Sequence, residues 1–215
     1  MKLTVLGATG RTGLEVVRQA LKDGHEVTAV VRDPARLPVQ GELLTVATVP
    51  DVTDAEALRP LVAGRDAVLS GLGPTGRKTT GIAEAGTRAI VRAMEAGDTR
   101  RLITISAAPV GPSPEGEGFL GRKVLLPLIG AILKDVYTDL AAMEDELRRS
   151  ALDWTTMRPG NLTKKPFTGR YRKVIGANVP NAGSLGRADL ALAMLDCVGD
   201  PATVKQVVGV GAAKG

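Results

Sequence analysis

Short apolar runs alternate along the chain with segments in which apolar residues recur every three or four positions. The short runs are typical of buried strands, whereas the three-to-four spacing is typical of amphipathic helices. The pattern predicts strands over 3–6, 27–31, 43–46, 67–69, 101–105, 153–157 and 205–208. It predicts helices over 14–21, 54–61, 82–96, 136–147 and 187–198, with Thr53 as a candidate cap for the second of them.

Strands that alternate with helices indicate a mainly parallel sheet, because parallel neighbours need a crossover between them. Such crossovers place helices on both faces, so the expected class is α/β, a Rossmann fold with a doubly wound sheet. The chain has 215 residues and no long linker, and residues 1–215 are expected to form a single domain. The least regular stretch, 107–121, fits either a substrate loop or a plain surface loop.

Composition narrows the range of functions. Aromatic residues make up 2% of the chain and the net charge is +5 without a long basic run, so nucleic-acid binding is not expected. A single cysteine, Cys197, excludes an internal disulfide and a cysteine metal site, and no metal is expected. The single histidine, His25, fits a surface turn. The chain starts directly with a strand, and its longest apolar stretch, 124–133, is too short to span a bilayer, so a cytoplasmic location without membrane contact is expected.

The strongest motif is Gly7-Ala8-Thr9-Gly10-Arg11-Thr12-Gly13, between the first expected strand and the first expected helix. In this G-x-x-G-x-x-G pattern the first glycine allows a tight turn and the second lets backbone approach a pyrophosphate. The third lets the helix pack closely against the strand. The N–H groups at the start of the helix would then face the phosphates. A motif in this context predicts a bound nicotinamide dinucleotide.

The type of dinucleotide is indicated after the second strand, by Val30-Val31-Arg32-Asp33-Pro34. An acidic residue there typically binds the ribose 2′-hydroxyl of NAD, whereas an arginine accommodates the 2′-phosphate of NADP. Arg32 is placed to bind a 2′-phosphate, and Arg36 and Arg11 are candidates to assist it. We therefore expect NADP rather than NAD, with Asp33 as the residue that would favour NAD instead.

Two further strand ends fit a bound dinucleotide. Asp51 and Val52 follow the third strand, where a carboxylate could meet the adenine amino group. Leu72 and Gly73 follow the fourth strand, where backbone could pass close to the ribose and pyrophosphate. Either pair could be a simple turn, but both fall on successive strand ends along one edge of the sheet.

These residues resemble the atypical short-chain dehydrogenase/reductase superfamily, specifically its small NAD(P)H-binding, NmrA-like branch. The resemblance covers nearly the whole chain and is greatest to the NADPH-dependent flavin reductases, also called biliverdin-IXβ reductases. The chain is also similar to NmrA-like redox-sensing regulators and to a group of quinone reductases. Further markers are Thr104-Ile105-Ser106, Ser150-Ala151-Leu152-Asp153-Trp154, Met157-Arg158-Pro159-Gly160 and Arg187-Ala188-Asp189-Leu190-Ala191.

The resemblance implies both a cofactor site and a position for the nicotinamide. It implies that Ser106 lies beside the nicotinamide ring. It also implies that the cofactor is bound by Thr9, Arg11, Thr12, Arg32, Arg36, Asp51, Val52, Leu72 and Gly73.

The chain departs from the superfamily at the proton donor. Members that act on alcohols use Tyr-x-x-x-Lys, in which the lysine lowers the pKa of the tyrosine. Here Tyr137 is followed at the fourth position by Ala141, and Lys134 precedes it by three positions. The flavin and biliverdin reductases carry a histidine after the sixth strand, where this chain has Gly160-Asn161. Ser106 and Tyr137 remain as catalytic candidates, and capping of the strand end is an equal alternative for Ser106.

Carbonyl reduction generates an alkoxide that needs a placed proton donor, whereas a reduced flavin or quinone is a delocalised anion that solvent can protonate. The sequence therefore predicts an NADPH-dependent reductase of planar acceptors, with 124–133 and the turn 161–163 as candidate walls of the pocket. The missing pair also motivates an alternative, a non-catalytic NADP(H)-binding redox sensor with a protein partner. A sugar-nucleotide epimerase is less favoured because it needs the tyrosine base. A monomer or a small homo-oligomer is expected.

Overall fold

The computed structural model describes residues 1–73, 81–112 and 133–213. Its main sheet comprises β1 (Lys2–Leu6), β2 (Glu26–Val31), β3 (Leu44–Thr48), β4 (Ala67–Ser70), β5 (Arg101–Ile105), β6 (Asp153–Pro159), β8 (Tyr171–Ile175) and β10 (Gln206–Ala212). A separate parallel pair is formed by β7 (Asn161–Thr163) and β9 (Ser184–Gly186). The helices are α1 (Gly13–Lys22), α2 (Ala55–Val62), α3 (Ile82–Glu95), α5 (Lys134–Arg149) and α6 (Arg187–Asp196).

The order of the strands in the main sheet is β3-β2-β1-β4-β5-β6-β10-β8. All neighbours are parallel except β8, which runs antiparallel to β10. The first six strands follow the order of the dinucleotide-binding Rossmann fold, in which the chain reverses its direction across the sheet between β1 and β4. The predicted fold class is confirmed.

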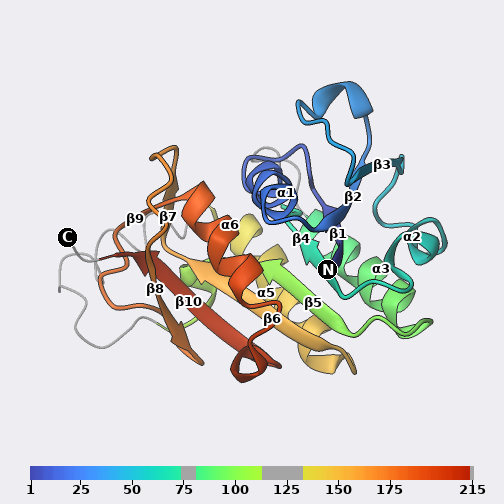
Figure 1. Ribbon diagram of the computed structural model, residues 1–215. Coiled ribbons are helices and arrows are strands. Elements are labelled where there is room, and N and C mark those ends of the chain that lie inside the picture. Colours follow the sequence, from blue (N-terminus) through green and yellow to red (C-terminus); the bar gives the residue numbers. More distant parts are fainter. Residues whose placement is uncertain (74–80, 113–132, 214–215) are drawn as a thin grey trace.

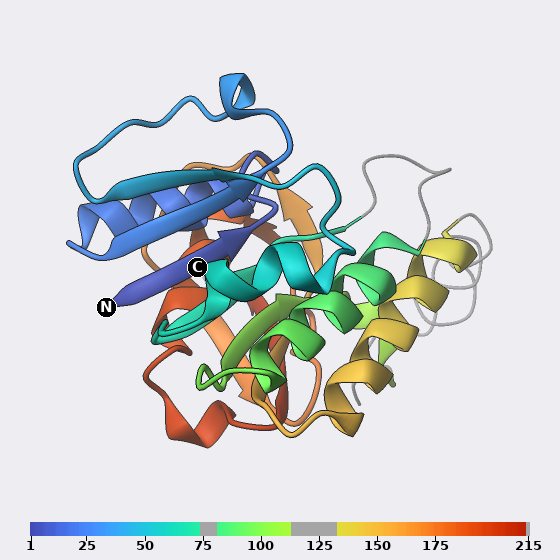
Figure 2. The same cartoon turned by 90° about the vertical axis from the view of Figure 1, so that its right-hand side faces the viewer.

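Helices cover both faces of the sheet, and each face has its own core. α1 and α6 pack together on one face (Figure 1). Figure 2 shows α2, α3 and α5 side by side on the other face. Because side chains alternate along a strand, Leu3 and Val5 of β1 enter the core beneath α1 and α6, whereas Leu6 enters the opposite core.

Three local expectations were wrong. β6 continues through Arg158 and Pro159 instead of ending at Met157, because it pairs with β10 as far as Pro159 and Val210. Residues 161–163, expected as a turn, form the strand β7 because they pair with β9. The cap of α2 is Asp54 and not Thr53: the Asp54 carboxylate accepts hydrogen bonds from two N–H groups of the first turn.

The start of α3 is capped from another helix. Its N-cap residue, Gly81, has no side chain, and the carboxylate of Asp139 on α5 takes over this role. Asp139 accepts hydrogen bonds from the N–H groups of Ala83 at 3.2 Å and Glu84 at 2.9 Å, and it is 4% exposed. A carboxylate is favourable at a helix N-terminus because of the helix dipole. This contact fixes α5 relative to α3.

Replacing Asp139 with alanine is expected to lower the free energy of unfolding by about 1–3 kcal/mol, because one buried and one partly buried N–H group lose their acceptor. Asp145→Ala on the same helix is the matched control. Asp145 is exposed and pairs with Arg148 at 2.8 Å, and an exposed pair contributes about 0–1 kcal/mol. Urea unfolding followed by circular dichroism measures both variants, and equal losses would contradict the capping role.

Candidate functional site

The carboxyl ends of β1, β4 and β5 meet at one edge of the sheet, where the strand order reverses. Leu6 of β1 is in register with Ser70 of β4, and Ser70 is in register with Thr104 of β5. The residues that follow these strands, including the glycine turn and Ser106, therefore lie along the same edge. Open α/β sheets bind their ligands at this position.

The turn after β1 lies so close to neighbouring backbone that only glycine fits. Gly7 has a φ of +69°, and a Cβ on it would lie 2.8 Å from the carbonyl carbon and oxygen of Gly71. A Cβ on Gly13 would lie 2.2 Å from the carbonyl oxygen of Gly7. The Gly10 N–H donates to that same oxygen at 2.8 Å. This packing has the features that a pyrophosphate-binding glycine turn requires.

Helix α1 starts at the end of the glycine turn. Its N-cap residue, Thr12, is 8% exposed, and its side chain makes no capping hydrogen bond. The first N–H groups of a helix lack partners within the helix and carry the positive end of its dipole. This helix start is therefore suited to the phosphates of a dinucleotide. Thr9 and Arg11 belong to the same turn, and Arg11 is exposed.

The residues after β2 bear on the type of cofactor. Arg32 and Arg36 are both exposed, and Arg36 ends the one-turn helix η1 (Pro34–Arg36). Asp33 turns its carboxylate back to its own backbone, where Oδ1 accepts a hydrogen bond from the Ala35 N–H at 3.0 Å. Neither arginine forms an ion pair with another residue of the described ranges.

A further arginine lies near the glycine turn. Arg187 is the first residue of α6 and is partly buried. Burial lowers the pKa of its guanidinium, and the positive charge of Arg11 lowers it further. An anion between these two positive charges would relieve their repulsion. Sequence reasoning did not give Arg187 a role, although it begins one of the family markers.

The other predicted cofactor residues follow β3 and β4. Asp51 is exposed and Val52 is buried. Hydrogen bonds from the backbone and the hydroxyl of Thr53 lower the pKa of the Asp51 carboxyl. Leu72 packs against α3, and Gly73, beside it, is partly buried. These four residues flank the predicted site at strand ends, and their contacts with a cofactor stay predictions.

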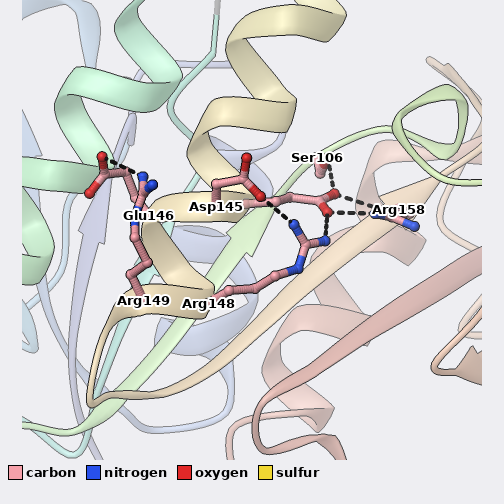
Figure 3. Close-up of polar contacts among 7 residues, drawn as sticks. Ser106, Asp145, Glu146, Arg148, Arg149 and Arg158 are labelled. Atoms are coloured by element: carbon pink, nitrogen blue, oxygen red, sulfur yellow. Dashed lines mark hydrogen bonds and ion pairs between the residues drawn. The ribbon is translucent and has the colours of Figure 1, made fainter.

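Ser106 follows β5 directly and contacts a buried ion pair. Ser106 is 5% exposed, and its hydroxyl donates to Oε1 of Glu144 at 2.7 Å. Arg158 of β6 donates to the same oxygen through Nε at 2.8 Å and to Oε2 through Nη2. Arg148 donates to Oε2 at 2.7 Å through Nη2 (Figure 3). Glu144 is 1% exposed, and a buried carboxylate of this kind is stable only because donors surround it.

Sequence reasoning missed Glu144. The residue follows Leu140 by four positions and precedes Leu147 by three, and both leucines are buried with it on one side of α5. Residues at these spacings share one face of a helix. An acidic residue on an apolar face was the available signal. Its partner Arg158 was recognised only as part of a family marker.

A row of hydroxyl groups crosses the sheet next to Ser106. Ser70, Thr104 and Thr156 occupy paired positions on β4, β5 and β6, and each is at most 2% exposed. The hydroxyls of Thr104, Thr156 and Thr87 of α3 have no hydrogen-bond partner within the described ranges. The core beneath the site therefore contains a row of polar groups, and buried hydroxyls of this kind commonly bind water.

Tyr137 lies in the first turn of α5 and packs, partly buried, against a small apolar cluster of α3 and α5. Burial raises the pKa of its phenol. A Tyr-x-x-x-Lys pair has the opposite effect, because a neighbouring ammonium group stabilises the phenolate. Ala141 occupies the position of that lysine.

The second tyrosine, the histidine and the cysteine lie away from this edge. Tyr171 on β8 donates to Asp196 at 2.6 Å, and burial raises the pKa of its phenol. His25 precedes β2 and lies 3.5 Å from the N-terminal amine, at the opposite end of the strands. Cys197 is buried after α6, which raises the pKa of its thiol. None of the three is placed to serve Ser106 or the glycine turn.

Two further observations concern other classes of protein. In the ranges 1–73, 81–112 and 133–213, no group of three His, Cys, Asp or Glu residues is arranged to bind a metal. None of the helices in those ranges combines the length and apolar character of a membrane-spanning segment. Of the predicted pocket wall 124–133, only Leu133 is among the described residues.

The sequence matches the family model of NAD(P)H-binding proteins over residues 7–201. This chain belongs to the NAD(P)H-binding family. Over 202 residues, 91% of each protein, it is 28% identical to the uncharacterized protein YwnB of Bacillus subtilis (strain 168). The family match supports a nicotinamide cofactor for this member of the family.

Solved structures agree with the family. A candidate NADH-flavin reductase from Streptococcus pneumoniae has a TM-score of 0.80 and 23% identity, covering 99% of this chain and all of its own. A short-chain dehydrogenase/reductase from Veillonella parvula has a TM-score of 0.82 and 22% identity, covering 98% and 94%. At such identities the likeness shows the fold. Together with the family match, this fold agrees with the expected resemblance to atypical short-chain dehydrogenases/reductases.

Gly13→Ala is expected to destabilise the protein by about 1–3 kcal/mol and to abolish nicotinamide dinucleotide binding. The new methyl group would overlap the Gly7 carbonyl oxygen, and relief of the overlap must move the glycine turn. Gly41→Ala is the control, because nothing lies within 4 Å of its Cβ position. Urea unfolding and calorimetric titration with NADPH measure both effects, and normal binding by the Gly13 variant would contradict this site.

Proposed function

We propose that this member of the NAD(P)H-binding family is an NADPH-dependent reductase that transfers a hydride to a planar acceptor such as a flavin or a quinone. The observation that carries the proposal is the apolar environment of Tyr137, which packs, partly buried, against residues of α3 and α5, and this burial raises the pKa of its phenol. With alanine at position 141, no ammonium group from that position facilitates proton donation by this phenol.

The choice of acceptor follows from this proton donor. When bound, reduced nicotinamide supplies a hydride, which is two electrons and one hydrogen nucleus. A ketone that takes up this hydride becomes an alkoxide, and its formation depends on a proton donor within the site. A flavin or quinone becomes a delocalised anion and takes its proton from solvent afterwards. The apolar surroundings of Tyr137 then suit it to contact a planar ring rather than to donate a proton.

The preference for NADPH rests on the residues after β2. Oδ1 of Asp33 already accepts the hydrogen bond that caps η1, which leaves less of this carboxylate for a ribose hydroxyl. Arg32 and Arg36 are exposed and lack ion-pair partners in the described part of the chain, which suits them to a 2′-phosphate. Arg11 and Arg187 would add positive charge at the glycine turn.

The flavin-reductase name of the Streptococcus pneumoniae neighbour supports the proposed class of acceptor. That name gives NADH as the donor, so the choice of nucleotide in this protein rests on its own residues. The experiment that tests the proposal follows absorbance of NADPH with riboflavin, FMN, menadione and a panel of ketones and aldehydes.

Oxidation of NADPH is expected with flavins or quinones and not with the carbonyl panel. Tyr137→Phe is expected to retain turnover within about three-fold, because the phenol is not the proton donor. A rate that depends on Tyr137, or reduction of ketones alone, would overturn the proposal. Tight NADP(H) binding without turnover of any acceptor would instead favour the redox sensor, a function that shares this site.

Arg32→Ala is expected to weaken NADPH binding by about 10- to 100-fold, the effect of losing a charge-assisted hydrogen bond. Binding of NADH should change little, because NADH has no 2′-phosphate. Arg18→Ala is the matched control: this exposed arginine of α1 pairs with Glu15 at 2.9 Å. Fluorescence titration with both nucleotides measures the effect, and equal losses for NADPH and NADH would refute the assignment.

A further inference from the structure

The hydrogen bond between Ser106 and Glu144 has a fixed direction. The Glu144 carboxylate accepts four hydrogen bonds, two from Arg158, one from Arg148 and one from Ser106. A carboxylate offers about four acceptor positions, so each of these is in use. The hydroxyl of Ser106 is the donor in its contact with Glu144, at 2.7 Å.

This direction determines what Ser106 can offer a ligand. A serine hydroxyl has one hydrogen to donate and two lone pairs that accept. Its hydrogen is directed to Glu144, so only the lone pairs remain for a ligand at the end of β5. Ser106 can therefore accept a hydrogen bond from an N–H or O–H group of a ligand. It would be repelled by a carbonyl oxygen or an unprotonated ring nitrogen, because these atoms also carry lone pairs.

We infer that Glu144 is a positioning residue that holds Ser106 as a hydrogen-bond acceptor, and that Ser106 accepts from the carboxamide N–H of the nicotinamide. The inference rests on the proposed function, because it takes the nicotinamide to lie beside Ser106. The reacting atoms of an oxidised flavin or quinone are themselves acceptors, so the serine lone pairs would repel them. The carboxamide has two N–H donors. Holding this amide in place orients the nicotinamide ring and so selects the ring face that is turned to the hydride acceptor.

The surroundings of Glu144 make this arrangement rigid. Arg158 is 7% exposed and holds both carboxylate oxygens, while Arg148 closes the solvent side. A bidentate arginine fixes the plane of a carboxylate. Oε1 is thereby held toward Ser106 whether or not a ligand is bound, and the acceptor lone pairs are pre-oriented.

The test compares NADP⁺ with its 3-acetylpyridine analogue, in which a methyl ketone replaces the amide and removes the N–H donors. Isothermal titration calorimetry gives both dissociation constants for each variant. The readout is the ratio of the dissociation constant of the analogue to that of NADP⁺, which measures the preference for NADP⁺. Ser106→Ala is expected to lower this ratio by about three- to ten-fold, the effect of one hydrogen bond. Thr104→Val removes a buried hydroxyl of the same strand that has no hydrogen-bond partner among the described residues, and it should leave the ratio unchanged.

Glu144 is tested in the same way. Glu144→Gln presents an amide N–H to Ser106, reverses the hydrogen bond and is expected to lower the ratio as Ser106→Ala does. Arg148→Ala removes only the exposed partner of Glu144 and should leave the ratio unchanged. If circular dichroism shows that Glu144→Gln is unfolded, Glu144→Asp retains the charge for Arg158 but withdraws the oxygen from Ser106 by one methylene, with the same expected result.

An unchanged ratio in a folded Ser106→Ala variant would overturn the inference, and so would an unchanged ratio in a folded Glu144 variant. Neither result would affect the proposed function, which NADPH turnover with flavins or quinones tests separately. Failure of the native protein to bind either dinucleotide would reject the cofactor and the inference together.

Discussion

The contact between the backbone after β1 and the backbone after β4 is the constraint on which the site depends. Gly7 lies against Gly71, and Gly13 lies against Gly7, at distances that leave no room for a Cβ. This contact brings the start of α1 to the point where the strand order reverses. A helix start suited to phosphate and the ends of β4 and β5 thereby share one edge of the sheet.

The features of this arrangement that could be predicted are those determined by residues close together in the sequence. The glycine turn was found because its requirement is carried by seven consecutive residues between a strand and a helix. The mainly parallel sheet with helices on both faces followed from the alternation of elements and the handedness of crossovers. By contrast, β8 pairs with β10 across an antiparallel edge, and its sequence, Tyr171–Ile175, has three polar or charged residues and no apolar run that would mark it.

The site beyond the glycine turn was harder to predict, because its contacts are formed by residues far apart in the chain. Ser106 and Glu144 are separated by 38 positions, and Asp139 lies 56 positions from the Ala83 N–H that it caps. An acidic residue on a helix normally indicates a solvated face. Only the packing of α5 against the sheet and α3 shows that these two carboxylates are buried.

The two carboxylates explain how α5 contributes to a site that lacks a Tyr-x-x-x-Lys pair. In enzymes that have the pair, the corresponding helix supplies the proton donor and the group that activates it. Here the same helix supplies Asp139, which fixes α3, and Glu144, which fixes Ser106. Both act on backbone or side chains of the protein rather than on a substrate. A helix whose two buried carboxylates are committed to positioning suits hydride transfer to an acceptor that needs no proton at the moment of transfer, which is the chemistry proposed for this protein.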